Sequence, residues 1–224
     1  VIHQPDFIPY LGFFHRFLYA DEYIILDNVQ FIKKSSKTWQ HRDKIKTSNG
    51  ESWLSLSVKS APLETKLKDI MLIQDQSWKK KHLNVLTYNY KNSNYFYEIF
   101  PFIEELYSIN VEKMVEFNLN AINILCRLFN IKIPQIRASS LDVSGKANEL
   151  VVNILKVVKA THYLSGIGAK DYFEKDIFER AGIEILWQNF KHPVYPQLYG
   201  EFIPYLSSID LLFNCGIEKS REIL

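Results

Sequence analysis

The chain has 224 residues, 47% of them hydrophobic, and its 27 basic and 25 acidic side chains give a net charge of +2. This length and composition predict one domain with a sizeable core, spanning residues 1–224. The near-neutral charge argues against a DNA partner. The two cysteines are not clustered, which argues against a disulfide scaffold or a metal site. No apolar run reaches the roughly 20 residues of a membrane span, so we expect a cytoplasmic protein.

The first 58 residues predict a strand, a helix, a second strand and an antiparallel hairpin. Val1-Ile2 has the character of a strand end, and Pro9 suits the first turn of a helix that runs to about residue 20. Residues 23–26 form a short continuous apolar run, as expected of a buried parallel strand. Residues 30–58 contain an Asn49-Gly50 turn and an alternating strand from Trp53, and we expect them to form an antiparallel excursion over the site.

The rest of the chain divides into a helical block and an alternation of strands and helices. Helical periodicity over three segments between residues 79 and 130 predicts a helical annex. Strands and helices then alternate, which is the pattern of a parallel sheet. The elements predicted there are strands at 132–136, 161–164 and 183–187, helices at 147–159 and 169–180, a proline-containing loop, and a last helix from 207 to about 214.

This order of elements predicts an α/β fold with a mostly parallel, Rossmann-like nucleotide-binding sheet, an antiparallel excursion and a helical annex. In open α/β sheets, ligands bind at the carboxyl ends of the strands. We therefore expect the strands that end near His3, Asp27 and Leu164 to be neighbours or near-neighbours that share one pocket.

Three residues are candidates for catalysis. His3 follows a strand and has an intrinsic pKa suited to a base near neutral pH, whereas His15 lies about two turns into the predicted helix. Asp27 follows the second strand and could act as a general base or bind a substrate amine. Structural alternatives exist for each: His15 could cover the helix surface, His3 could form a local hydrogen bond, and Asp27 could cap a loop.

Further residues are candidates for binding the substrate or a nucleotide. Lysine and arginine in the basic stretch could neutralise phosphates, and a glycine-rich turn between strand and helix lets the backbone approach an anion. The alternatives are a solvated charged face and, for Ser207 with Asp210, a helix cap. The candidates are Gln4, Gln30, Lys34, Trp39, Arg42, Ser165, Gly166, Tyr195, Gln197 and Asp210.

Taken together, these segments resemble the WbqC-like protein family over nearly the whole chain. The sequence departs from the usual family pattern with Asn28 in place of a second Asp, with His41 and Asp43 in place of Asn, and with a Leu56-Ser57-Val58 run that lacks the usual proline. The matching segments are His3-Gln4-Pro5, Pro9, Leu11 to Phe14, Ala20-Asp21, Ile25 to Asp27, Val29 to Phe31, Lys34, Trp39-Gln40, Arg42, Trp53-Leu54, Tyr163 to Gly166, Tyr172, Tyr195 to Gln197, Phe202, Pro204 and Ser207 to Gly216.

The resemblance implies a role in bacterial surface polysaccharide (O-antigen, lipopolysaccharide) synthesis and, specifically, a glycine transferase that acts on an amino sugar. The expected partners are a nucleotide-linked amino sugar and an amino acid donor, free or tRNA-bound. A weaker likeness of the first loop and the Ser165 turn to nucleotidyltransferases leaves two alternatives open: a nucleotidyltransferase, or an amide ligase that uses ATP with Mg²⁺. A non-catalytic subunit that binds a nucleotide-sugar is a third.

Overall fold

A computed structural model describes residues 1–33 and 38–224. Three short strands form a parallel sheet, with β2 (Tyr23–Ile25) between β1 (Ile2–His3) and β5 (Gln135–Arg137). A second parallel pair consists of β6 (His162–Ser165) and β7 (Glu184–Trp187). The prediction of an α/β fold with mostly parallel strands is confirmed. β1 and β6 lie side by side, but β1 is only two residues long and their hydrogen-bond ladders do not join.

The connection between β1 and β2 is a short helical segment. It begins as the α-helix α1 (Leu11–His15) and continues as the 3₁₀-helix η1 (Arg16–Tyr19), so the predicted helix has the expected extent but tightens in its second half. The apolar side chains of this segment, at Leu11, Phe13, Phe14 and Phe17, are buried. Their burial fixes the segment against the sheet and the helical block.

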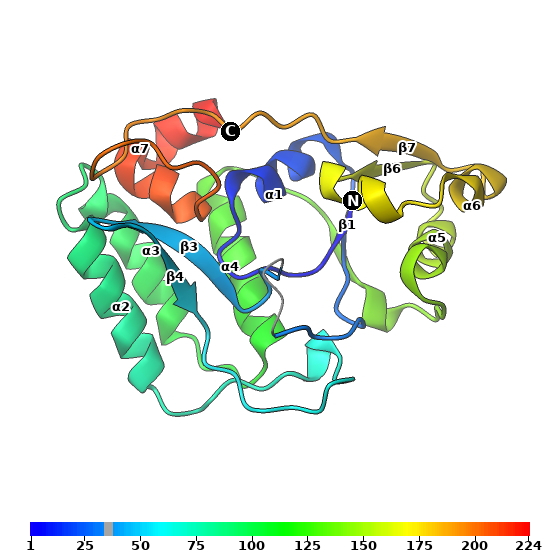
Figure 1. Cartoon of the computed structure of the whole chain (residues 1–224), viewed down its shortest axis with the longest axis horizontal. Coiled ribbons are helices and arrows are strands. Elements are labelled where there is room, and N and C mark those ends of the chain that lie inside the picture. The colour runs from blue at the N-terminus through cyan, green and yellow to red at the C-terminus, as the bar shows by residue number, and fades with distance from the viewer. Residues whose placement is uncertain (34–37) are drawn as a thin grey trace.

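The antiparallel excursion is confirmed as a hairpin of β3 (Arg42–Thr47) and β4 (Gly50–Ser55). Gly50 has a φ of 100°, a conformation that favours glycine, and this explains the Asn49-Gly50 turn. After the 3₁₀-helix η2 (Leu67–Asp69), the predicted annex follows as α2 (Ser77–Tyr90), α3 (Phe96–Ser108) and α4 (Met114–Leu128). Figure 1 shows these three helices together on one side of the molecule.

The C-terminal half differs in detail from the predicted elements. It contains η3 (Ala138–Ser140) and α5 (Ala147–Val157), and the predicted helix over 169–180 is instead the 3₁₀-helix η4 (Ile167–Tyr172) followed by α6 (Lys175–Arg180). Gly168, a weak α-helix former, lies within the 3₁₀ part. The last helix, α7 (Ser208–Ile223), is longer than predicted and continues across a kink at Gly216.

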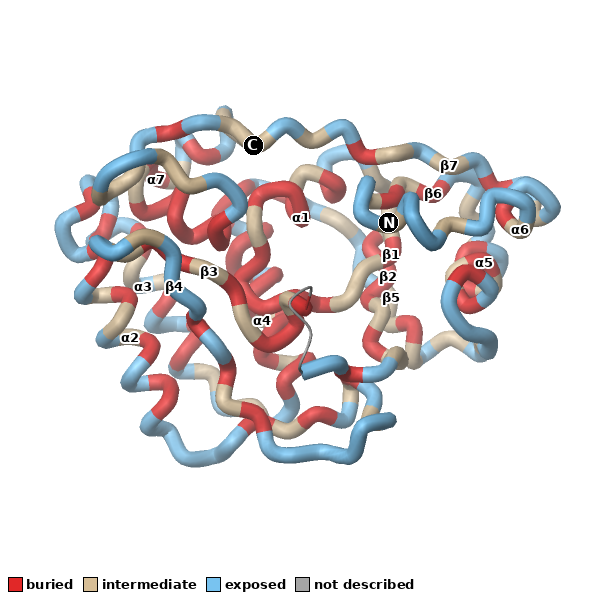
Figure 2. The backbone as a smooth tube through the Cα atoms, in the orientation of Figure 1, coloured by how far each residue is buried: buried red, intermediate tan, exposed pale blue. Residues whose placement is uncertain are grey.

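Two hydrophobic clusters make up the core. The larger includes the annex, α1, the hairpin and α7, and the smaller lies among β1, α5, β6 and α6. Alternate residues of β2 contribute to different clusters, because Tyr23 and Ile25 belong to the larger and Ile24 to the smaller. Because β2 is buried on both faces, its residues form a continuous apolar run. Figure 2 shows the buried strands between the two halves of the molecule. None of the described helices could span a membrane.

Candidate functional site

The candidate site lies where the carboxyl ends of β1 and β6 meet. β1 pairs with β2 in one parallel sheet and contacts β6, which pairs with β7 in the other. In open α/β sheets, ligands bind at the carboxyl ends of the strands. His3 ends β1, and Ser165 and Gly166 end β6 and begin the following turn.

Arg16 is a buried cation at this position. It is the first residue of η1 and only 4% exposed, because the aromatic side chains around it belong to the core. Its guanidinium carbon lies 5.5 Å from the centre of the Phe13 ring. Within residues 1–33 and 38–224, neither a hydrogen bond nor an ion pair of this guanidinium is found, and its Nε is fully buried without a partner. A buried arginine without a partner is costly, so its environment is prepared for an anion.

Asp6 and His3 lie beside this cation. Nδ1 of His3 is 3.6 Å from Oδ2 of Asp6 and 2.8 Å from the backbone oxygen of Gln4. Burial raises the pKa of Asp6 to about 7, although Arg16 opposes the change. Burial, assisted by Arg16, lowers the pKa of His3 to about 3. At neutral pH the pair therefore combines an uncharged imidazole with a carboxyl group close to its midpoint of titration.

Gln188 and Gly166 face Arg16 from the other strand pair. Gln188 follows β7 and is 6% exposed, and its side-chain nitrogen donates a hydrogen bond of 2.7 Å to the carbonyl of Gly12. A Cβ atom added to Gly166 would lie 3.8 Å from Nη1 of Arg16 and 4.0 Å from Oε1 of Gln188. A cationic donor and an amide oxygen thus lie beside the position that a side chain of residue 166 would occupy.

Tyr10 closes the site on the side of the hairpin. Its ring lies over Gly12, where a Cβ atom would come within 2.4 Å of it, so a glycine is needed there. Burial raises the pKa of Tyr10, and the charges that act on its hydroxyl include Arg16, Asp6 and the buried Asp43. The groups around Arg16 thus come from the N-terminal loop, η1, the turn after β6 and the residue after β7.

The predicted residues of the N-terminal loop lie around this site. Nδ1 of His15 is 3.3 Å from the side-chain nitrogen of Gln188, and its ring contacts Tyr19 and Phe190. The side-chain oxygen of Gln4 accepts a hydrogen bond from Gln40, and this bond ties the loop to the start of the hairpin.

Asp27 has structural partners. It is fully buried after β2, and its carboxylate accepts hydrogen bonds of 2.9 Å from the backbone nitrogen and 2.7 Å from the hydroxyl of Ser139. This carboxylate therefore joins β2 to η3. These contacts correspond to the structural alternative for Asp27, a cap of a loop.

The predicted residues of the basic stretch lie apart from Arg16, on the hairpin and its surroundings. The Arg42 guanidinium carbon lies 4.2 Å from the centre of the Trp53 ring, and Trp39 contacts the same ring at 5.3 Å. Gln30 is exposed and donates to the carbonyl of Leu63 at 2.7 Å. Lys34 falls outside the described residues.

Tyr195, Gln197 and Asp210 form a separate, buried network. Asp210 accepts hydrogen bonds from Tyr195 at 3.0 Å, from Gln197 at 2.8 Å and from Tyr90 at 2.8 Å. Lys46 donates to Gln197 at 2.9 Å, which brings a cation next to this carboxylate. Ser207 caps α7 as predicted, but Asp210 turns to this network instead of completing a capping box.

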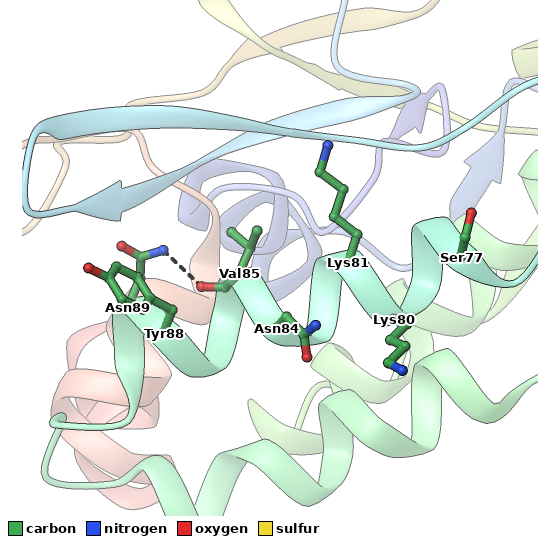
Figure 3. A pocket seen from close by; sticks show the side chains of 7 residues that line it. All are labelled: Ser77, Lys80, Lys81, Asn84, Val85, Tyr88 and Asn89. Carbon is green, nitrogen blue, oxygen red and sulfur yellow. Dashed lines mark hydrogen bonds between the residues drawn. The ribbon is translucent and has the colours of Figure 1, made fainter.

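Two surface hollows of about 520 Å³ each lie elsewhere. One runs along α2, and Figure 3 shows that its polar side chains do not converge, because Lys81 points toward the hairpin and Lys80 away from it. The other lies between the end of α4 and β5. Neither is lined by the buried, partnerless groups that mark the Arg16 site, so we place the candidate site at Arg16. No cluster of three potential metal-binding side chains is found in the part of the chain that the structure describes.

Sequence reasoning missed Asp6, Arg16 and Gln188. Asp6 lies in the same motif as His3, and Gln188 directly follows a predicted strand, so the rule that identified His3 applies to both. The signal at Arg16 is a charged residue between the aromatic residues Phe14 and Phe17. A charge inside an apolar helical face predicts either a buried functional group or a side chain that reaches the surface.

Comparisons with known proteins match most of the chain. The chain is 30% identical over 218 residues to a protein of Mycobacterium tuberculosis (strain ATCC 25618 / H37Rv) described as "Uncharacterized protein Rv1507c", and the match covers 96% of this chain and 93% of that protein. The comparison with solved structures found no match. The profile of the WbqC-like protein family matches residues 4–222. The chain therefore belongs to the WbqC-like protein family.

Proposed function

We propose that this protein transfers an aminoacyl group, glycine or one of similar size, to the amine of a nucleotide-linked amino sugar in bacterial surface polysaccharide synthesis. The observation that carries the proposal is the pair of His3 and Asp6 beside Arg16. An amine attacks an acyl carbon only after it has lost a proton, and a base whose pKa lies near the working pH is best suited to accept it. Asp6, with a pKa of about 7, meets this requirement better than His3, whose pKa burial lowers to about 3.

The reaction needs two proton transfers and one exchange of bonds. The sugar ammonium gives a first proton to the Asp6 carboxylate, and the free nitrogen attacks the acyl carbon of an activated donor. The new C–N bond forms while the bond to the leaving group breaks, and the leaving group departs with the electron pair. The nitrogen then gives its second proton to the leaving oxygen of the tRNA ester, or to water where the leaving group is AMP. His3, uncharged and 3.6 Å from Asp6, orients the carboxylate. The donor is an aminoacyl adenylate made from ATP or an aminoacyl ester of tRNA.

We assign the nucleotide part of the substrate to the hairpin. Trp53 is 40% exposed, and the side chains of Arg42 and Lys44 lie 4.2 Å and 5.2 Å from the centre of its ring. An exposed indole can stack on a base, and cations suit a diphosphate. Phe7 donates to the carbonyl of Trp39 at 3.0 Å, so the start of the hairpin is fixed to the loop that carries Asp6.

The test is a transfer assay with purified protein. Wild-type protein is incubated with a UDP- or dTDP-linked amino sugar and either glycine with ATP and Mg²⁺ or glycyl-tRNA, and the amide product is detected by mass spectrometry. Asp6→Asn should lower turnover by about 10²-fold, the usual effect of losing an acid–base group. Asp21→Asn, an exposed carboxylate in the same part of the chain, is the matched control and should keep full turnover.

Two outcomes would contradict the proposal. Full turnover of the Asp6→Asn variant would remove Asp6 from the chemistry. Binding of the sugar nucleotide by the wild type without turnover from either donor would favour a non-catalytic subunit.

A further inference from the structure

We infer that Arg16 and Gln188 bind a free α-amino acid over Gly166, with the carboxylate on the guanidinium and the ammonium on the amide oxygen. The inference rests on the proposed function, because it names the form in which the acyl donor reaches the site. It depends on three features of this part of the molecule: two buried side chains with unused hydrogen-bonding groups, the missing side chain at Gly166 beside them, and the balance of charge.

The two side chains offer one cationic donor group and one acceptor. Arg16 and Gln188 are 4% and 6% exposed, and the Arg16 guanidinium has no hydrogen bond within the described ranges 1–33 and 38–224. The nitrogen of the Gln188 side chain is committed to the carbonyl of Gly12, and this bond fixes the orientation of the amide. The oxygen of the amide is thereby turned toward Gly166, and the described residues provide it with no donor.

Gly166 lies beside both groups and has no side chain. Its φ of −71° and ψ of 148° are extended values that any residue can adopt, so the backbone does not require a glycine. The position of an added Cβ lies 3.8 Å from Nη1 of Arg16 and 4.0 Å from Oε1 of Gln188. Both polar groups therefore lie next to the side-chain position of residue 166, and a glycine leaves that position without a side chain. A ligand that lies over the Gly166 backbone would have the guanidinium and the amide oxygen beside it.

The balance of charge favours a single carboxylate over a diphosphate. Among the described residues, Arg16 is the one cation whose charge shifts the pKa values of His3, Asp6 and Tyr10. Besides Asp6, the buried carboxyl of Asp43 also influences the pKa of Tyr10. One guanidinium matches one carboxylate in charge and in its planar, two-pronged geometry. A carboxylate with an adjacent ammonium is the α-amino acid group, which satisfies the donor and the acceptor together.

Calorimetric titration tests the inference with three probes. Glycine carries both charged groups, acetate only the carboxylate, and glycinamide only the ammonium. We expect glycine to bind and each of the other two to bind at least about tenfold more weakly, since each lacks one charge-assisted hydrogen bond. Equal binding of acetate and glycine, or no binding of glycine, would overturn the inference, and so would tighter binding of ADP that depends on Arg16.

Two matched glycines provide the steric test. Gly166→Val places methyl groups between Arg16 and Gln188 and should abolish glycine binding. Gly168→Val, two residues along the same turn, has open space around the added Cβ and should bind glycine like the wild type. Equal binding by the two variants would contradict the inference.

Arg16→Met separates a binding role from a structural one. If the guanidinium serves to bind a ligand, Arg16→Met should abolish glycine binding. The variant should also raise the melting temperature of the unliganded protein, because an unpaired buried charge is lost. Arg127→Met is the control on the surface, where Arg127 pairs with Glu105. A lower melting temperature of Arg16→Met, together with retained glycine binding, would assign Arg16 to the fold alone.

The inference and the proposed function fail in different ways. Transfer from glycyl-tRNA by a protein that does not bind glycine would refute the inference and leave the transferase in place. Glycine binding that depends on Arg16, without transfer from either donor, would refute the transferase and leave the amino acid site in place.

Discussion

Nδ1 of His3 lies 3.6 Å from Oδ2 of Asp6, and burial shifts the pKa values of the two groups in opposite directions. Between about pH 4 and 6.5 the folded protein binds a proton at Asp6 that the unfolded chain has lost, and lacks a proton at His3 that the unfolded chain binds. The Asp6 contribution to the free energy of unfolding therefore falls with rising pH, whereas the His3 contribution rises. In the wild type these two contributions oppose each other.

Removing one partner should expose the contribution of the other. In Asp6→Asn, the free energy of unfolding should rise more steeply than in the wild type from about pH 4 to 7, because the opposing term has gone. In His3→Gln it should rise less steeply, or fall, from about pH 3 to 6.5. Each slope should differ from the wild type by at most about 1.4 kcal/mol per pH unit, and by less for His3, whose side chain keeps 32% of its surface exposed. Urea unfolding at a series of pH values measures both slopes, and parallel curves for all three proteins would contradict the pKa shifts.

Asp27→Asn should lower stability without changing the chemistry. Both carboxylate oxygens accept from Ser139, and the amide of the variant would replace these two charge-assisted hydrogen bonds by weaker neutral ones, with its nitrogen donating to the Ser139 hydroxyl in a fully buried position. We expect a loss of about 1–3 kcal/mol in the free energy of unfolding. Ser139→Ala removes only the hydroxyl and should cost less, about 0.5–1.5 kcal/mol. Chemical denaturation measures both, and a transfer rate per folded molecule well below that of the wild type would return Asp27 to the catalytic residues.

Gly216 should tolerate no side chain at the kink of α7. Its φ of 73° favours glycine, and an added Cβ would lie 2.5 Å from the ring of Tyr95. Gly200, with a φ of 59° and open space around it, is the matched control. Both alanine variants should lose stability through backbone strain, and Gly216→Ala should lose roughly 1–3 kcal/mol more because of the clash. Thermal unfolding of the two variants tests this, and equal losses would show that the helix shifts to make room.

Trp53→Ala should weaken the binding of a nucleotide-linked sugar. Loss of a stacking surface for the base is expected to cost roughly 1–3 kcal/mol, and Trp53→Phe should retain part of the affinity. Tyr97→Ala on α3 removes an aromatic side chain that is 87% exposed and should have no effect. Fluorescence or calorimetric titration measures the affinities. Unchanged binding in Trp53→Ala would place the nucleotide away from the hairpin.

The sequence by itself determined the local elements and one edge of the site. The apolar run at Tyr23–Ile25 predicted a buried strand, and the Asn49-Gly50 turn predicted the hairpin. Helical periodicity predicted the annex, and the position of His3 after a strand predicted a residue at a ligand-binding edge. These features could be read because hydrophobic periodicity and turn chemistry act over a few neighbouring residues.

Only the tertiary structure decided which polar groups meet. Gln188 bonds to Gly12 across 176 positions of the chain, and Asp210 bonds to Tyr90 across 120, so neither pairing has a local signal. Arg16 could have reached solvent from a helix surface, and it is buried because aromatic side chains of η1 and α1 pack into the core on either side of it. The partnerless charge at the centre of the candidate site is therefore a product of long-range packing, which no short segment of sequence encodes.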